Sequence, residues 1–142
     1  MVKARSLIVA EQVKPTIVFL CVENSCRSQI AEAFGRKFAR KTYEVKSAGS
    51  LPSGKVNPTA IKLMNELGYD ISSHASTSIN QLHQAEIEVI VSMGCGDVCP
   101  NILAKEKTEW EIPDPKEMSL SDFRKIRDLI KNKVEKLSLI HI

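Results

Sequence analysis

From residue 21 to residue 28 the sequence reads Cys21-Val22-Glu23-Asn24-Ser25-Cys26-Arg27-Ser28. The apolar run Thr16–Leu20 precedes this stretch, and Gln29–Lys41, which has apolar residues at helical spacing, follows it. A short run that is apolar throughout is typical of a strand buried on both faces in a parallel sheet. The pattern therefore predicts a strand that delivers Cys21 into a short loop, with a helix beginning near Arg27.

This loop has the composition of an oxyanion site. Successive backbone N–H groups can converge into an anion-binding nest, and a helix N-terminus adds unpaired donors and the positive end of its dipole. Arg27 offers a planar fork of donors to two oxygens of a tetrahedral anion. The same field favours the thiolate of Cys21, to which Ser28 can donate a hydrogen bond, so Cys21 is the candidate nucleophile. The alternative is a buried cysteine that ends a strand beside an unrelated arginine.

Size and charge limit the remaining possibilities. A chain of 142 residues suits one domain, which buries roughly 70% of its unfolded surface and needs no disulfide or structural metal to fold. Its net charge of +3 comes from scattered Lys and Arg, a distribution that does not favour a nucleic-acid partner. No apolar run reaches the length of a membrane span, so we expect no membrane partner and a cytoplasmic location. Four cysteines are then more typical of reactive thiols than of structural disulfides.

Strands and helices alternate along the rest of the chain. Further strands are predicted at Tyr43–Ser47, Ile87–Met93 and Lys107–Ile112, and further helices at Asn57–Leu67, Ser78–Gln84 and Leu120–Leu137, the last with Ser121 as N-cap. We expect residues 1–15 to be an N-terminal extension, 16–138 to form the domain and 139–142 to be a C-terminal tail. The alternation predicts a single α/β domain with a parallel sheet, which binds ligands beyond the carboxyl ends of its strands.

Two further cysteines belong to a loop that follows a predicted strand. Because Cys21 and Cys95 both follow strands, they can share one edge of the sheet. Redox exchange between Cys95, Cys99 and the nucleophile is one use of this pair. A metal site is the alternative, but zinc needs four ligands and the remaining candidates, such as His74 and His83, are scattered along the chain. We therefore expect redox thiols and no bound metal.

Further motifs accompany the cysteine loop between Thr16 and Leu137. They are Ser28-Gln29, Ala31-Glu32, Ser47-Ala48-Gly49, Asn57-Pro58, Ile71-Ser72-x-His74, the pair Cys95 and Cys99, and Asp114-Pro115. Together they resemble the arsenate reductases that are built on the low-molecular-weight tyrosine phosphatase fold. The resemblance implies a flavodoxin-like domain in which helices flank a four-stranded parallel sheet.

The resemblance also implies a role for each motif. Cys21 would attack arsenate, Arg27 would bind the oxyanion and Asp114 would be the general acid. The oxyanion-binding loop would comprise Val22, Glu23, Asn24, Ser25, Cys26, Arg27 and Ser28. Cys95 and Cys99 would be the resolving pair, and their disulfide would be reduced by an external thiol donor of the thioredoxin or glutaredoxin type. No cofactor would be bound, and the partners would be arsenate or phosphate and this reductant.

The sequence departs from the family pattern at two places. Val22-Glu23 stands where many members have Thr-Gly, which places an acid in the loop. Some members bind potassium near the loop, and Thr77 stands where an acidic potassium ligand is expected, although Asn24, Glu32 and Ser47 match the rest of that set.

Two other functions stay open at this point. A phosphatase would form a phosphocysteine at Cys21 and use Asp114 as acid and base, without needing Cys95 and Cys99. The segment Lys116-Glu117-Met118 replaces the tyrosine-bearing segment that is typical of such phosphatases, which favours the reductase. The remaining alternative is an oxyanion-binding module without catalysis.

Overall fold

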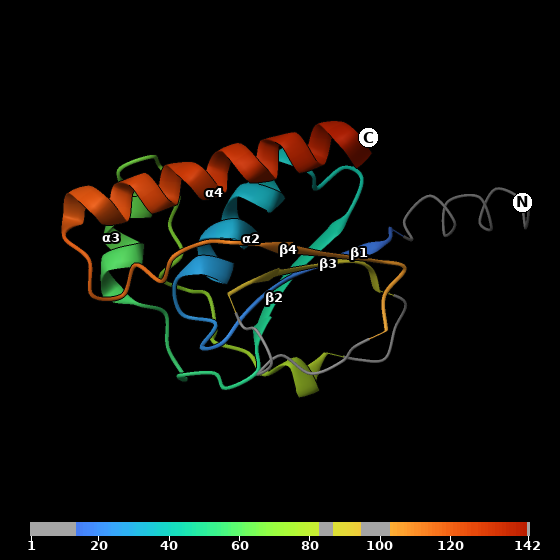
Figure 1. Cartoon of the computed structure of the whole chain (residues 1–142), viewed down its shortest axis with the longest axis horizontal. Coiled ribbons are helices and arrows are strands. Elements are labelled where there is room, and N and C mark those ends of the chain that lie inside the picture. The colour runs from blue at the N-terminus through green and yellow to red at the C-terminus, as the bar shows by residue number, and fades with distance from the viewer. Residues whose placement is uncertain (1–13, 83–86, 95–102, 142) are drawn as a thin grey trace, which may run out of the picture.

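Four parallel strands form one sheet in the order β2-β1-β3-β4, which the computed structural model shows in Figure 1. The structure describes residues 14–82, 87–94 and 103–141, with side chains up to Leu137. The strands are β1 (Thr16–Cys21), β2 (Glu44–Gly49), β3 (Ile87–Met93) and β4 (Glu106–Trp110), and the helices are α2 (Arg27–Phe38), α3 (Pro58–Asn65), α4 (Leu120–His141) and the 3-10 helix η1 (Ile79–Gln81). The predicted α/β domain with a four-stranded parallel sheet is confirmed.

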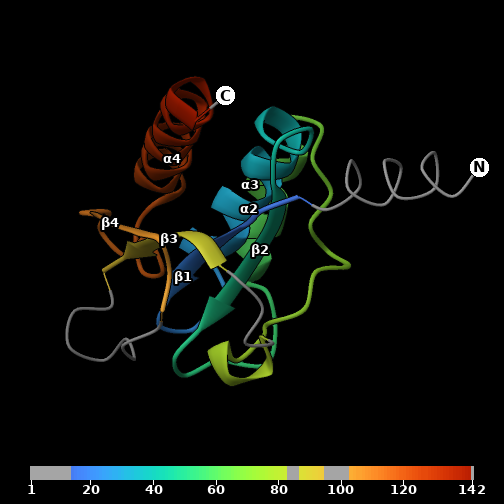
Figure 2. The ribbon, with the colours of Figure 1, turned by 90° about the vertical axis from the view of Figure 1, so that its right-hand side faces the viewer.

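The two faces of the sheet are covered differently. Helices α2, α3 and α4 lie on one face, while η1 lies on the other (Figures 1 and 2). Alternate residues of β1 divide between them, because successive strand side chains point to opposite faces. Phe19 and Cys21 belong to the larger apolar core under the helices, and Val18 and Leu20 to the smaller core with Ile79 of η1. The central strand is therefore buried on both sides, as its apolar sequence predicts.

Local signals explain where the helices begin. The Asn57 side chain accepts hydrogen bonds from the backbone N–H groups of Thr59 and Ala60 and so caps α3. The prediction of Ser121 as the cap of α4 is wrong: α4 begins at Leu120, and the Asp122 N–H donates to the Ser119 hydroxyl at 3.2 Å. A cap must precede the first helical residue, and Ser119 holds that place.

Several predicted element ends also differ from the structure: α2 ends at Phe38 rather than Lys41, α3 ends at Asn65 rather than Leu67, and η1 covers Ile79–Gln81 of the predicted Ser78–Gln84 helix. Helix α4 continues past Leu137 to His141, because no Gly or Pro is present there to stop it. Strand β2 extends beyond its predicted end at Ser47 to include Ala48 and Gly49, because these two residues pair with Leu20 and Cys21 of β1. Strand β4 ends at Trp110 rather than Ile112. At β2 and β4, pairing with a distant segment, and not local periodicity, decides where the strand ends.

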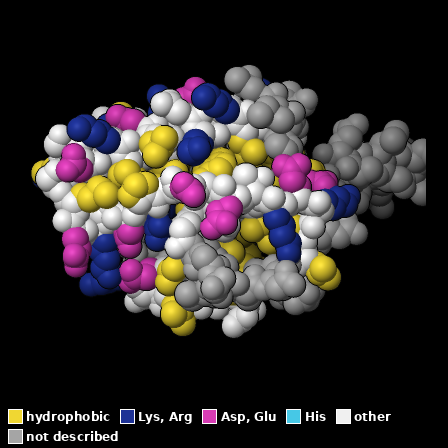
Figure 3. Space-filling model, viewed as in Figure 1, with side chains coloured by type: hydrophobic (Ala, Val, Ile, Leu, Met, Phe, Trp, Pro, Cys, Tyr) yellow, Lys and Arg dark blue, Asp and Glu magenta, His cyan; other side chains and the backbone are white. Residues whose placement is uncertain are grey.

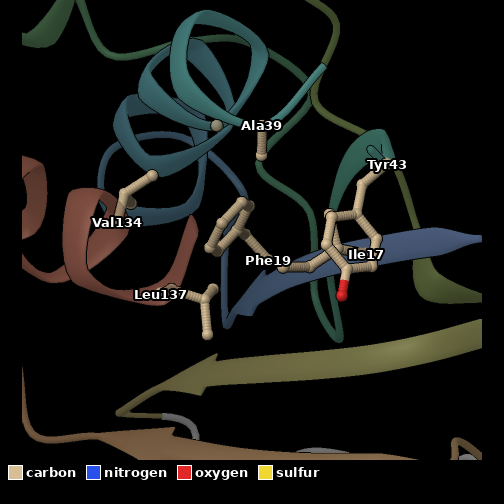
Figure 4. A pocket seen from close by; sticks show the side chains of 7 residues that line it. Ile17, Phe19, Ala39, Tyr43, Val134 and Leu137 are labelled. Carbon is tan, nitrogen blue, oxygen red and sulfur yellow. The ribbon is translucent and has the colours of Figure 1, made fainter. Parts of the chain in front are cut away.

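A small apolar cavity of about 10 Å³ lies between the sheet and the helices (Figure 4). Its lining is Ile17, Phe19, Gly35, Ala39, Tyr43, Val134 and Leu137. A space of this size holds one water molecule at most, and the lining side chains are mostly apolar. The cavity is a packing gap in the core and is too small to hold a ligand.

The surface carries both signs of charge. Figure 3 shows Lys and Arg side chains interspersed with Asp and Glu on one face of the molecule. This mixture agrees with the small net charge of +3. None of the helices within the described residues is long and apolar enough to cross a membrane.

Candidate active site

Cys21 is the last residue of β1, at the carboxyl edge of the sheet. Its neighbours in space are β2, where Gly49 pairs with it, and β3 on the other side. Residues 22–26 form the loop, and α2 begins at Arg27. The predicted strand, loop and helix around Cys21 are thus confirmed. Cys21 itself is buried, with 2% of its surface exposed.

One hydroxyl lies against the Cys21 sulfur. The Ser28 Oγ is 2.9 Å from the Cys21 Sγ, and it also accepts a hydrogen bond from the Asn24 Nδ2 at 2.7 Å. Since Ser28 has one hydroxyl proton and its oxygen already accepts from Asn24, that proton is available to the sulfur. Ser28 can therefore stabilise Cys21 both as a nucleophile and as a leaving group.

The backbone of the loop is shaped for an anion. Asn24 has φ +50°, a left-handed conformation that is uncommon for residues other than glycine. Within the described residues, the backbone N–H groups of residues 23–26 donate to no protein acceptor. Consecutive N–H groups left free in this way are the donors of an anion-binding nest.

A buried polar network supports the loop from behind. The Asn24 Nδ2 also donates to the Ser47 Oγ at 3.0 Å, and the Ser47 hydroxyl donates to Glu32 Oε1 at 2.5 Å. Glu32 is in turn 2.9 Å from the Arg36 guanidinium and 3.5 Å from the His74 ring nitrogen. The network fixes the Asn24 side chain, and with it the left-handed turn of the loop.

Gln29 belongs to the sequence motif, but its role as a support of the loop was not predicted from the sequence. Its side-chain amide donates to the Asn24 carbonyl at 3.0 Å and to the Ala75 carbonyl at 2.9 Å, and its Oε1 is 3.0 Å from the His74 Nδ1. Gln29 is fully buried. A polar residue on the first turn of a helix beside a loop is the signal that could have found it.

Within the part of the chain that the structure describes, no group of three or more His, Cys, Asp and Glu side chains could hold a metal ion. Thr77 stands where the family pattern has an acidic potassium ligand. Its backbone N–H donates to the Asn24 Oδ1 at 2.7 Å, so this position offers a donor and not a carboxylate. His74 lies against Glu32.

Asp114 lies beside the start of α2. The Arg27 Nη1 donates to the Ile112 carbonyl at 3.0 Å, and its Nη2 is 3.8 Å from the Asp114 Oδ2. Gly94, which follows β3 with φ +78°, makes this possible, because a Cβ at that position would overlap the Arg27 Nη1. The structure thus brings an arginine, a carboxylate and the Cys21 loop to one edge of the sheet.

Cys26 lacks the close hydroxyl contact that Cys21 has. It is 4% exposed, and burial raises its pKa from 9.0 to about 11, the largest of several effects. The Ser25 hydroxyl, 3.8 Å from the sulfur, lowers the pKa only in part. Cys26 is therefore a neutral thiol near pH 7.

Of the remaining predicted site residues, some lie in the loop and others lie outside the residues that the structure describes. Val22 packs on the smaller core, and the Glu23 side chain is in contact with Lys116. Cys95 and Cys99 lie outside the described residues, as does His83. The described chain before the pair ends at Gly94, which lies against Arg27.

Comparison with known proteins gives one consistent result. Residues 16–140 match the family described as low molecular weight phosphotyrosine protein phosphatase. Arsenate reductase 2 of Staphylococcus epidermidis is 42% identical over 125 residues, which cover 86% of this chain and 95% of that protein. The solved structure of an arsenate reductase in the phosphate binding state has a TM-score of 0.80 at 34% identity and covers 90% of this chain and 99% of its own. A thioredoxin-dependent arsenate reductase of Corynebacterium glutamicum has a TM-score of 0.71 at 32% identity and covers 94% of this chain and 67% of its own.

Proposed function

Because the chain belongs to the low molecular weight phosphotyrosine protein phosphatase family and is an arsenate reductase, we propose that Cys21 is its nucleophile. Arg27 and the loop N–H groups bind the oxygens of arsenate, and Asp114 is the general acid. The observation that carries this assignment is the shared edge of the sheet, where Cys21 is 2.9 Å from Ser28 and Arg27 is 3.8 Å from Asp114.

The first step joins arsenic to sulfur. The Cys21 thiolate attacks arsenate, and one arsenate oxygen leaves as water after it receives a proton from Asp114. The loop N–H groups and Arg27 stabilise the negative charge on the remaining oxygens. Ser28, which is in contact with the sulfur, holds the thiolate before the attack.

The second step transfers two electrons. The Cys95 thiolate attacks the Cys21 sulfur, the electron pair of the sulfur–arsenic bond stays on arsenic, and arsenite leaves. Cys99 then attacks Cys95 and releases Cys21 as a thiolate, because a thiol that is stabilised as its anion is the better leaving group. The product is a Cys95–Cys99 disulfide.

An external dithiol completes the cycle. We propose a reductant of the thioredoxin type, and the support for it is the thioredoxin-dependent relative from Corynebacterium glutamicum. A glutaredoxin system with glutathione is the alternative donor. A cycle that ends in a disulfide needs a compartment that supplies reduced thiols, so we place the reaction in the cytoplasm.

Hydrolysis of phosphate esters is the second candidate activity. The match to a phosphatase family and the approach of Asp114 to Arg27 favour it. A phosphocysteine at Cys21 would be hydrolysed without Cys95 or Cys99. We expect this activity to be weak and to persist when the resolving pair is removed.

Mapping of disulfides after a single arsenate turnover tests the relay. The wild type should contain a Cys95–Cys99 bridge, and Cys99→Ser should accumulate a Cys21–Cys95 bridge. Cys95→Ser and Cys99→Ser should both abolish multiple turnover with thioredoxin and its reductase, while hydrolysis of an aryl phosphate continues.

Cys26→Ser is the matched control, because it removes a thiol from the same loop and should leave the relay intact. A Cys21–Cys26 bridge in the wild type would make Cys26 the resolving thiol. Full arsenate turnover in Cys95→Ser and Cys99→Ser would instead show that these two residues are not the resolving pair. Parallel assays with glutathione and glutaredoxin identify the donor.

A further inference from the structure

An ion pair joins the oxyanion loop to the segment that carries Asp114. The Lys116 Nζ is 3.2 Å from Glu23 Oε1 and 3.1 Å from Oε2, so it contacts both oxygens of the carboxylate. The Lys116 backbone N–H donates to the Asp114 Oδ1 at 3.1 Å. Lys116 therefore binds the candidate acid Asp114 through its backbone and Glu23 of the loop through its side chain. The contact with Glu23 also raises the pKa of Lys116, which keeps the lysine charged.

Glu23 is a fixed anchor for this contact. Its carbonyl accepts hydrogen bonds from the Ser53 N–H and from the Ser76 hydroxyl, both at 3.0 Å. These bonds tie the loop backbone at Glu23 to two other segments of the chain.

The Asp114 segment has fewer supports. The Asp114 side chain is 49% exposed, and its other contact is Arg27 at 3.8 Å. Pro113 and Pro115 limit the backbone on either side of it. Besides the Arg27–Asp114 contact, the Glu23–Lys116 pair is a direct side-chain link between this segment and the loop within the described residues.

We propose that Glu23 and Lys116 form a latch that positions Asp114 over the oxyanion loop. The latch acts through Asp114 and so rests on the proposed role of Asp114 as the acid. When the latch is closed, the Asp114 proton is held next to the arsenate oxygen that leaves as water. Lys116 also pairs with the charge of Glu23, which stands where many family members have glycine. Glu23 therefore does not present an unpaired negative charge to arsenate.

The test is the single-turnover rate of arsenite release at saturating arsenate. An exposed ion pair contributes little, so Glu23→Gln and Lys116→Met should each slow this rate by about two- to fivefold. The double variant should be no slower than either single variant, because all three open the same latch. Lys116→Arg, which keeps the charge and the reach, should retain the wild-type rate.

The arsenate concentration for half-maximal rate separates the latch from a general structural role. Lys116→Met leaves the Glu23 charge unpaired and should raise this concentration, whereas Glu23→Gln removes the charge and should not. Glu88→Gln is the matched control, since Glu88 pairs with Lys105 at 3.6 Å and is about as exposed as Glu23, but belongs to the other end of β3. It should change neither quantity.

The Asp114→Asn background decides whether the latch acts through Asp114. Opening the latch in this background should cause no further loss of rate. A loss of the same size with Asp114→Asn present, or losses that multiply in the double variant, would overturn the latch. A wild-type rate in both single variants would also overturn the latch, but it would leave the role of Asp114 as the acid unaffected. If Asp114→Asn alone leaves the rate unchanged, the acid role itself fails and the latch fails with it.

Discussion

Cys21 and Cys26 belong to one loop, yet their surroundings assign them different chemistry. The Cys21 sulfur lies 2.9 Å from the Ser28 hydroxyl, which can donate to it and belongs to the first turn of α2. The Cys26 sulfur is buried, and burial raises its pKa to about 11. A neutral buried thiol is a poor nucleophile. Both sulfurs are buried, so the two cysteines of this short motif differ in the hydroxyl beside them, which lies 2.9 Å from the Cys21 sulfur and 3.8 Å from the Cys26 sulfur.

The raised pKa of Cys26 predicts a pH dependence of stability. Below pH 9 the thiol is neutral in both the folded and the unfolded chain, so the folded state has its full stability. Between about pH 9 and 11 the unfolded chain loses the proton first, so stability falls as pH rises through this window. Relative to Cys26→Ala, the wild type should lose about 2 kcal/mol of unfolding free energy between pH 8 and 11.

Urea unfolding of both proteins at several pH values, with reductant present, measures this loss. The comparison cancels the other groups that titrate in the same range. A difference between the two proteins that stays constant from pH 8 to 11 would mean that Cys26 is solvated in the folded state.

At the scale of elements, the close approach of β2 to the loop after β1 sets the shape of the site. Strand β2 continues to Gly49, next to Cys21. The Ser50 N–H donates to the Cys21 carbonyl at 3.3 Å, and the Leu51 N–H donates to the Val22 carbonyl at 2.8 Å. The loop is therefore held along its first residues by hydrogen bonds of a neighbouring strand and its extension.

Gly49→Ala should distort this contact. A Cβ at Gly49 would lie 2.5 Å from the Val22 carbonyl oxygen and 2.9 Å from the Asn24 nitrogen, both of which are backbone atoms of the loop. Since backbone cannot rotate away, the loop must shift, and we expect a loss of about 1–3 kcal/mol in unfolding free energy. Phosphate binding, measured by calorimetry, should weaken as well.

Gly35→Ala is the control for Gly49→Ala. Its Cβ would lie 2.9 Å from side-chain atoms of Phe19 and of Val45, in the core and not in the loop. This variant should lose stability while phosphate binding stays unchanged. Equal losses of phosphate affinity in the two glycine variants would show that the Gly49 contact has no special part in shaping the loop.

At the scale of the whole molecule, an ion cluster fastens the long helix α4 to α3. Glu66 at the end of α3 lies 2.7 Å from the Arg124 guanidinium and 2.8 Å from that of Arg127, and the Arg127 Nη1 also donates to the Leu63 carbonyl at 3.0 Å. Helix α4 also supplies Phe123 and Ile130 to the larger apolar core under the helices. The cluster therefore joins the outer helix to the rest of the domain.

The cluster predicts how the protein responds to acid. Hydrogen bonds from Arg124 and then Arg127 lower the pKa of Glu66 from 4.5 to about 2. The stability that Glu66 contributes is present above pH 4.5 and is lost as pH falls from 4.5 to 2. Glu66→Gln should remove this part of the pH dependence, so that its unfolding free energy falls less steeply in acid.

Thermal or urea unfolding at pH 3 to 6 measures the slope for Glu66→Gln, with Glu88→Gln as the control on a weaker ion pair. Identical slopes in the wild type and in Glu66→Gln would show that the cluster is solvated and contributes nothing.

Much of the fold follows from local sequence. The apolar run Thr16–Leu20, the helical spacing after Ser28 and the alternation of strands and helices suffice to predict a parallel sheet with Cys21 at its carboxyl edge, because strand and helix periodicities are properties of neighbouring residues. The same signals place Asn57 at the start of α3. They fail at Ser121 and at the end of β2.

The tertiary structure alone decides which distant residues meet. The approach of Asp114 to Arg27, the room that Gly94 leaves for the guanidinium, and the contact of Glu23 with Lys116 join segments that are far apart along the chain. No periodicity encodes such distances, because they depend on how each strand pairs and on where each connection returns to the sheet. The sequence by itself thus determines the strand, loop and helix that carry the candidate nucleophile Cys21, while the packing of separate segments determines how the charges around them are arranged.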